Sequence, residues 1–383
     1  MDLSLTDEQR SFRRAAREFL DAEAVPHRAE WDRREAVDRG IVGRLGDMGF
    51  LGLTLPEEYG GVGGDHLTYC LAREELGRAD SALRGIVSVS NGLVGKSILA
   101  RGTEEQKQRW LPGIASGELL GCFGLTEPGH GSDAGNLRAR AVRDGDDYVI
   151  DGSKVFITNG TWADICLVFA RTGGEGPRGI SAFLVPTDTD GFEAREIKGK
   201  LGLRGQATAE LSLSGVRVPA DALLGEEGEG FKIAMATLDK GRMSVAAGCV
   251  GIVQGCLEET VAYAKERTQF GRPLASFQLV QDMIAEMSVD ADAARLLCWR
   301  TADLVDRGEP FGVAASKAKL FASEAAVKAS NLAIQAFGGY GYVDDYPVQK
   351  YMRDARVMTL YEGTSQIQKL LIGRAETGVS AFL

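Results

Sequence analysis

The stretch "NLRARAVRDGDDYVIDGSKVFITNG", residues 136–160, decides the fold class because it alternates apolar and polar side chains, the period of a half-buried strand. It contains Asp144-Gly145 and Asp151-Gly152, and each Asp-Gly pair is typical of a tight hairpin turn. Further along, "ISAFLVP" (180–186) and "AELSLSGVRVP" (209–219) have the same character, and each ends at a proline. Roughly 100 residues of short strands without helices between them predict a small β-sandwich or barrel.

Helical patterns flank this region on both sides. "TDEQ" (6–9) and "TEEQ" (103–106) are capping-box patterns that begin helices within the first 120 or so residues. After "GEEGEGF" (225–231), helical periodicity predicts long helices over about 231–267, 276–307, 312–337 and 347–374, which is the pattern of a four-helix bundle. We therefore expect an α+β multidomain protein with an N-terminal helical domain (1–120), a central β-domain (121–228) and a C-terminal helix bundle (229–383).

Composition narrows the class of protein. The chain has 383 residues and 44 basic against 54 acidic side chains, so its net charge of −10 argues against a broad grip on nucleic acid or anionic membrane. Six scattered cysteines without a CxxC pair and only three histidines predict reduced thiols and no metal site. The acidic start "MDLSLTDEQR" is not typical of a signal peptide, and no apolar run approaches a membrane span, so we expect a cytoplasmic protein.

One glycine pattern needs its context. "GHGSDA" (129–134) fits the dinucleotide fingerprint, but a strand-like segment follows it where that fingerprint requires a helix, so we do not expect a Rossmann site. The glycines lie beside the hydroxyls of Thr126 and Ser132. From these residues alone, the loop is either a plain surface turn or a loop that presents amides and hydroxyls to a planar ligand.

A second ambiguous stretch is "RVMTLYEGTSQIQKLL" (356–371), where Glu362 stands between Tyr361 and Gly363. A glutamate on a helix is usually solvated. The aromatic and glycine neighbours instead suit a base held where water is scarce.

Taken together, several runs in order give the chain its resemblance to a known family. They are "LPEEYGG", "GLTEPGHGSDAG", "GSKVFITNG", "KLGLRGQATAEL", "GFKIAMATLDKGRM", "ERTQFGRPL", "QAFGGYGYVDDYPVQKYMRDAR" and "YEGTSQIQ". From about Leu5 to about Arg374 the chain resembles the acyl-CoA dehydrogenase family, most closely its short-chain members. The resemblance implies a helical domain, a β-domain and a four-helix bundle, with FAD between the last two. It also implies a homotetramer in which a neighbouring subunit completes the FAD site, and an electron-transferring flavoprotein as acceptor.

The reaction that the resemblance implies is the α,β-dehydrogenation of an acyl-CoA thioester, here a short-chain one, to the trans-2-enoyl-CoA. Glu362 matches the family's base, which removes the α-proton while a hydride equivalent passes from the β-carbon to flavin N5. Its backbone N–H matches the group that stabilises charge on the thioester oxygen. Some relatives carry their base just before the arginine of the segment matching "LDKGR", and Gly241 occupies that position here.

The resemblance also assigns binding residues. Those matched to the acyl-CoA substrate are Ser132, Asp239, Lys240, Gly241, Arg242 and Gly363. Those matched to the flavin ring are Phe123, Leu125, Thr126, Ser132, Phe156, Ile157 and Thr158, with the Thr158 hydroxyl aimed at N5. Those matched to the dinucleotide of a neighbouring subunit are Arg267, Gln278, Gln335, Ala336, Phe337, Gly338 and Gly339, and those matched to the adenosine half are Thr364 and Gln366.

Two details of this assignment stay open. Arg242 is three residues after Asp239, so an intrahelical salt bridge explains it as well as a substrate contact does. Phe156 occupies a position where relatives usually carry tryptophan, which changes the packing around a flavin. Two alternative functions also remain: an acyl-CoA oxidase on the same fold, and a catalytically silent CoA-ester-binding protein.

Overall fold

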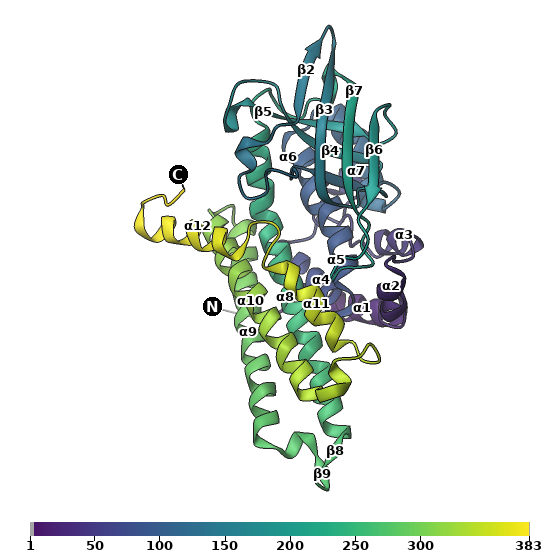
Figure 1. Cartoon of the computed structure of the whole chain (residues 1–383), viewed down its shortest axis with the longest axis vertical. Coiled ribbons are helices and arrows are strands. Elements are labelled where there is room, and N and C mark those ends of the chain that lie inside the picture. The colour runs from purple at the N-terminus through teal and green to yellow at the C-terminus, as the bar shows by residue number, and fades with distance from the viewer. Residues whose placement is uncertain (1–3, 383) are drawn as a thin grey trace.

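The N-terminal third is helical, as predicted. The computed structural model describes residues 4–382 (Figure 1). Its first helices are α1 (Asp7–Glu23), α2 (Arg28–Arg34), α3 (Gly40–Asp47), α4 (His66–Ala79), α5 (Ser81–Val87), the π-helical η2 (Ser88–Gly95), α6 (Lys96–Arg101) and α7 (Glu104–Ser116). Both predicted capping boxes are confirmed: Thr6 with Gln9 begins α1, and Thr103 with Gln106 begins α7.

The middle third is one seven-stranded mixed sheet. Its strands are β1 (Gly121–Gly124), β2 (Arg140–Asp144), β3 (Asp147–Thr158), β4 (Ile165–Arg171), β5 (Ile180–Pro186), β6 (Phe192–Glu196) and β7 (Thr208–Pro219). The strand order is β1-β4-β2-β3-β7-β6, and β5 pairs with β4 off this path. The sheet curls, and its apolar inner side chains form a core of their own. The predicted three-part architecture is therefore confirmed.

The two Asp-Gly pairs have different roles. Asp144-Gly145 begins the β2–β3 turn, where Asp144 pairs with Asp147 and Gly145 has φ +65°. The predicted turn at Asp151-Gly152 is wrong, because both residues lie inside β3. The pairing with β7 shifts register there, and a Cβ on Gly152 would lie 2.6 Å from Ala139 Cβ. This glycine therefore permits a bulge and a close backbone approach.

The C-terminal third is a bundle of long helices. They are α8 (Gly230–Glu266), α9 (Gln278–Asp306), α10 (Gly312–Phe337), α11 (Val348–Met358) and α12 (Ser365–Thr377), and a small hairpin of β8 (Thr268–Gln269) and β9 (Arg272–Pro273) joins α8 to α9. The predicted single helix over 347–374 is wrong. The chain leaves the helix at residues 359–364, where Glu362 and Gly363 have φ values of +50° and +91°. Helix α12 then projects away from the bundle (Figure 1).

Helix α8 is the centre of the molecule. It runs from beside the sheet to the β8–β9 hairpin and packs against α4, α9 and α10 (Figure 1). Contrary to the sequence expectation, an 18-residue window of α8 is apolar enough to span a membrane, with a mean hydropathy of 1.3. That window is 67% buried inside the protein, as expected for a core helix. Buried apolar residues of α1–α5 and α8–α11 form one cluster, so the two helical parts share a core.

All six cysteines are buried and unbridged.

Candidate active site

A cavity opens where the sheet, the η2 segment, α8 and the 359–364 turn meet. Its cavity volume is about 210 Å³, and the space widens to about 1020 Å³ when the open mouth is included. The residues predicted from sequence that line it are Phe123, Leu125, Thr126, Ser132, Phe156, Ile157, Thr158, Arg242, Glu362 and Gly363. Segments more than 200 residues apart in the sequence therefore meet around one space.

Other predicted residues lie elsewhere. Arg267 and residues 335–339 line a second hollow beside the β8–β9 hairpin, in which Phe337 stacks on Tyr263 with ring centroids 4.0 Å apart. Gln278, Thr364 and Gln366 line neither cavity. Within one chain, the predicted FAD residues that line a cavity are therefore split between two separate cavities.

Hydrogen bonds hold the 359–364 turn in its unusual backbone conformation. The Gln368 side-chain amide donates to the carbonyls of Glu362 and Gly363, at 3.3 and 3.0 Å. From α10, the buried Lys319 ammonium donates to the Gly363 carbonyl at 2.8 Å. A left-handed backbone at a glutamate persists only where its surroundings fix it, and such positions concentrate at functional sites.

The Glu362 side chain lines the cavity, and one of its carboxyl oxygens has no hydrogen-bond partner in the part of the chain that the structure describes. Its Oε2 atom is shut off from solvent and has no hydrogen-bond partner among the described residues. A Cβ on Gly241 would overlap this oxygen, so the carboxyl lies against the bare backbone of α8. Burial raises the pKa of Glu362, although the cations Arg84, Lys319 and Arg242 oppose the rise. A carboxylate with a raised pKa suits the role of a general base near neutral pH.

The residues predicted to bind substrate on α8 have different positions. Arg242 forms the predicted salt bridge with Asp239, and it also lines the cavity with its buried Nε unpartnered. Asp239 and Lys240 do not line the cavity. Gly241 contributes by leaving space for Glu362. Both readings of Arg242 are therefore compatible with its position.

A bulge at the end of β3 presents the predicted flavin contacts. The pairing with β7 shifts between Lys154 and Ile157, and Phe156 has φ +59° with 68% of its surface exposed. The Val155 N–H donates to the Thr126 carbonyl at 2.9 Å, which ties the 125–132 loop to this bulge. An aromatic side chain held exposed at a cavity mouth fits a planar ring ligand.

A buried ion pair supports the same loop. The Lys154 ammonium is fully buried and donates to Glu127 Oε1 at 2.8 Å and to the Leu125 carbonyl at 3.2 Å. Glu127 in turn accepts from the Arg138 and Ala139 N–H groups. The loop is therefore anchored before any ligand binds.

Sequence reasoning missed about half of the residues that line the cavity, among them the polar side chains of Gln206, Arg84 and Tyr361. Gln206 donates to Thr158 Oγ1 at 2.8 Å, which leaves the Thr158 hydroxyl proton free to point into the cavity. Arg84 on α5 is 1% exposed and lines the cavity beside Tyr361 and Glu362. Its only sequence signal is a lone charge in the otherwise apolar run "SALRGIV". The Thr158 hydroxyl and the exposed Phe156 ring are groups that suit a planar, hydrogen-bonding ring such as the isoalloxazine of FAD.

Comparison with known proteins identifies the family of the chain. Family models described as the N-terminal, middle and C-terminal domains of acyl-CoA dehydrogenase match residues 6–118, 122–216 and 228–377. A short-chain specific acyl-CoA dehydrogenase of Clostridium acetobutylicum is 45% identical over 97% of this chain and 98% of its own length.

Two solved structures extend the comparison. A chain in the structure of the electron transferring flavoprotein of Acidaminococcus fermentans is 45% identical, with a TM-score of 0.97 over 98% of this chain and 100% of that chain. Glutaryl-CoA dehydrogenase from Mycobacterium smegmatis is 40% identical, with a TM-score of 0.95 over 99% of this chain and 97% of that chain. The chain therefore belongs to the acyl-CoA dehydrogenase family of flavin oxidoreductases.

Proposed function

We propose that this protein dehydrogenates a short acyl-CoA thioester at its α,β-bond to give the trans-2-enoyl-CoA, with Glu362 as the base. The observation that carries the proposal is the buried, unpartnered Oε2 of Glu362 at the wall of an open cavity. A carboxylate with one oxygen shielded from water and without a partner is unfavourable for folding, so its presence points to chemistry.

In this mechanism the protein handles the proton and the positioning. The Glu362 carboxylate takes the α-proton, and desolvation makes it basic enough to do so. The Glu362 N–H donates to the thioester oxygen as charge develops there. Bound FAD supplies the acceptor for the hydride equivalent that leaves the β-carbon. Phe156 and Thr158 hold the ring of FAD, and Arg242 contributes positive charge beside the acyl-CoA.

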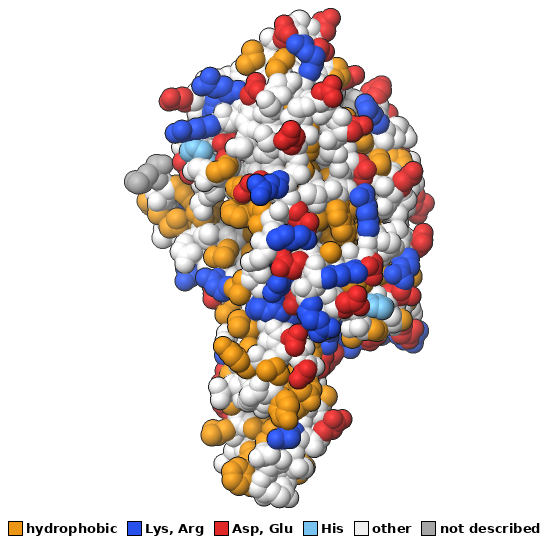
Figure 2. Space-filling view, turned by 45° about the vertical axis from the view of Figure 1, so that its right-hand side comes forward, with side chains coloured by type: hydrophobic (Ala, Val, Ile, Leu, Met, Phe, Trp, Pro, Cys, Tyr) orange, Lys and Arg blue, Asp and Glu red, His pale blue; other side chains and the backbone are white. Residues whose placement is uncertain are grey.

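The second hollow receives the dinucleotide end of FAD from a neighbouring copy in a homotetramer. We assign this role to Arg267, Gln278 and residues 335–339, and we assign the adenosine half to Thr364 and Gln366. An arginine beside an open hollow suits a pyrophosphate. Large apolar side chains are exposed on this part of the bundle: Phe270 is 93% exposed, Leu279 76% and Tyr342 85%. Figure 2 shows hydrophobic side chains gathered on the narrow end of the molecule, which supports burial between copies. Light scattering after size-exclusion chromatography tests the tetramer.

We assign reoxidation to an electron-transferring flavoprotein in the cytoplasm. The similarity to a chain in the structure of such a flavoprotein supports this choice. Steady peroxide production in air without another acceptor would instead indicate an oxidase.

The test of the dehydrogenation is anaerobic titration of the purified, flavin-loaded protein with acyl-CoAs of graded length and end group. We expect at least one short acyl-CoA to bleach the flavin absorbance. A bound flavin that stays oxidised with every acyl-CoA would indicate a silent CoA-ester-binding protein.

A further inference from the structure

Arg84 is a fully buried cation in the wall of the cavity that holds Glu362. It is 1% exposed, and helix α5 directs it toward Tyr361 and Glu362. Its stem packs on the bare backbone of α8, since a Cβ on Gly248 would lie 2.6 Å from Arg84 Cδ. A buried arginine is normally paired with a carboxylate, because an unpaired buried charge is strongly unfavourable.

The hydrogen bonds of Arg84 are incomplete. Its Nη2 donates to the Tyr361 hydroxyl and lies 4.0 Å from Met358 Sδ. Its Nε is buried and has no partner among the described residues, and no ion pair joins Arg84 to a carboxylate there. A guanidinium offers five N–H donors in a fixed fork, so much of this capacity remains for a ligand.

The surrounding charges also leave room for an anion. Three cations act on Glu362: Arg84, Lys319 and Arg242. Arg242 is paired with Asp239, whereas Lys319 donates to the Gly363 carbonyl. The charged side chains that line the cavity itself are Arg84, Arg242 and Glu362, so its wall carries more positive than negative charge.

Tyr361 supplies a second donor at the same place. It lines the cavity, and its hydroxyl proton points to Met358 Sδ at 2.7 Å. A thioether is a weak acceptor, so a carboxylate oxygen would readily replace it.

We propose that this cavity selects acyl-CoA thioesters whose short acyl chain ends in a carboxylate, which Arg84 and Tyr361 bind. The inference rests on the proposed function and names the acyl group that the reaction acts on. A carboxylate would complete the donors of Arg84, whereas a terminal methyl group would leave them unpaired in a desolvated wall. Sites built to hydrogen-bond a polar group discriminate strongly against analogues that lack it.

The test compares glutaryl-CoA with valeryl-CoA, which has the same five-carbon acyl length but ends in a methyl group. With the flavin-loaded protein we expect kcat/KM for flavin reduction to favour glutaryl-CoA by about 100-fold or more. Arg84→Met should lower the ratio of kcat/KM for glutaryl-CoA to kcat/KM for valeryl-CoA by about 100-fold, mainly through KM for glutaryl-CoA. Arg84→Lys should retain part of the preference for glutaryl-CoA that Arg84→Met loses. Tyr361→Phe should reduce this preference less than Arg84→Met does.

Arg73 provides the matched control. It is also fully buried with Nε and Nη2 unpartnered, but it lies on α4 and does not line the cavity. Arg73→Met should change thermal stability without changing the ratio between the two thioesters. A change in that ratio equal to the change in Arg84→Met would overturn the assignment to Arg84.

The outcomes separate the two proposals. Bleaching by valeryl-CoA as efficient as by glutaryl-CoA, or an equal loss of both in Arg84→Met, overturns the inference and keeps the dehydrogenation. If no thioester bleaches the flavin, the dehydrogenation fails. Calorimetric binding to the same flavin-loaded protein then decides: a preference for glutaryl-CoA that disappears in Arg84→Met supports the inference, and equal binding overturns it.

Discussion

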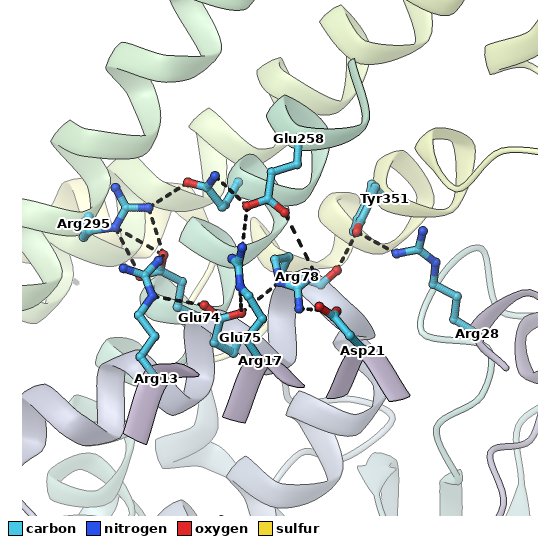
Figure 3. Close-up of polar contacts among 11 residues, drawn as sticks. Arg13, Arg17, Asp21, Arg28, Glu74, Glu75, Arg78, Glu258, Arg295 and Tyr351 are labelled. Carbon is cyan, nitrogen blue, oxygen red and sulfur yellow. Dashed lines mark hydrogen bonds and ion pairs between the residues drawn. The ribbon is translucent and has the colours of Figure 1, made fainter. Parts of the chain in front are cut away.

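Glu75 and Glu362 each have a carboxyl oxygen that is shielded from solvent, but the two residues differ in their hydrogen-bond partners. Glu75 on α4 accepts from Arg13 at 3.1 Å, from Arg17 at 2.9 Å and from Arg78 at 2.8 Å (Figure 3). Burial favours the neutral acid, but the hydrogen bonds and charges of Arg17 and Arg78 outweigh it and hold the pKa of Glu75 below its ordinary value. Burial dominates at Glu362 and raises its pKa.

The cluster around Glu75 continues between helices. Glu74 accepts from Arg13 and Arg295 at 2.9 Å each, and Glu258 accepts from Arg17 at 3.1 Å, which joins α1, α4, α8 and α9 (Figure 3). Satisfied buried charges hold the two helical parts together, whereas Glu362 is left unsatisfied beside a cavity. Burial alone therefore does not mark a functional acid, whereas a missing hydrogen-bond partner beside a cavity does.

The largest effect should come from Glu362→Gln. We expect the rate of flavin reduction by substrate to fall about 10³- to 10⁴-fold, because the amide cannot accept the α-proton. FAD should stay bound and the thermal midpoint should not fall, since the change removes an unpartnered, shielded carboxyl oxygen. Anaerobic stopped-flow absorbance measures the rate. Fast residual reduction would place the base elsewhere.

Glu75→Gln should have the opposite effects, with lower stability and an unchanged rate of flavin reduction. The change weakens the bonds that Arg13, Arg17 and the buried Arg78 donate to Glu75, although each arginine keeps a second carboxylate, so we expect the protein to be destabilised by about 1–3 kcal/mol. The rate of flavin reduction per folded molecule should be unchanged. Urea denaturation followed by fluorescence measures the change in the free energy of unfolding. Unaltered stability would mean that the cluster does not hold the helices together.

Gly241→Ala should disturb Glu362 without touching its charge. The new Cβ would overlap Oε2 and lie 3.1 Å from Leu93 Cδ2, so the carboxyl must move. We expect turnover to fall about 100-fold, the effect of misplacing a reacting group by about an ångström. Gly373→Ala on α12 is the control, because no atom lies near its added Cβ. Equal turnover in both variants would argue against the packing of Glu362 on α8.

The smallest effect should be a difference in how stability depends on pH. The folded-state pKa of Glu75 is depressed, so its contribution is present above the unfolded value and is lost as pH falls through the folded pKa. The folded-state pKa of Glu362 is raised, so its contribution declines as pH rises from the unfolded value through the folded pKa. The urea midpoint of Glu362→Gln, measured relative to that of the wild type, should therefore increase between pH 4 and pH 8. A constant difference would contradict the raised pKa.

Local patterns predicted the helices, the strands and both capping boxes, because these depend on neighbours in the sequence. The turn around Glu362 escaped prediction, since helical periodicity continues through it and only Gly363 interrupts it. Gly152 was misread because a bulge depends on the strand opposite. The role of Arg84 could not be read from sequence, because its contact Tyr361 lies 277 residues away.

The pH dependence of anaerobic flavin reduction tests the central claim most directly. The rate in the wild type should rise with pH through a midpoint above 4.5, the ordinary pKa of a glutamate, and the rise should be absent in Glu362→Gln. A midpoint at or below 4.5, or the same rise in Glu362→Gln, would contradict the assignment of Glu362 as a buried base.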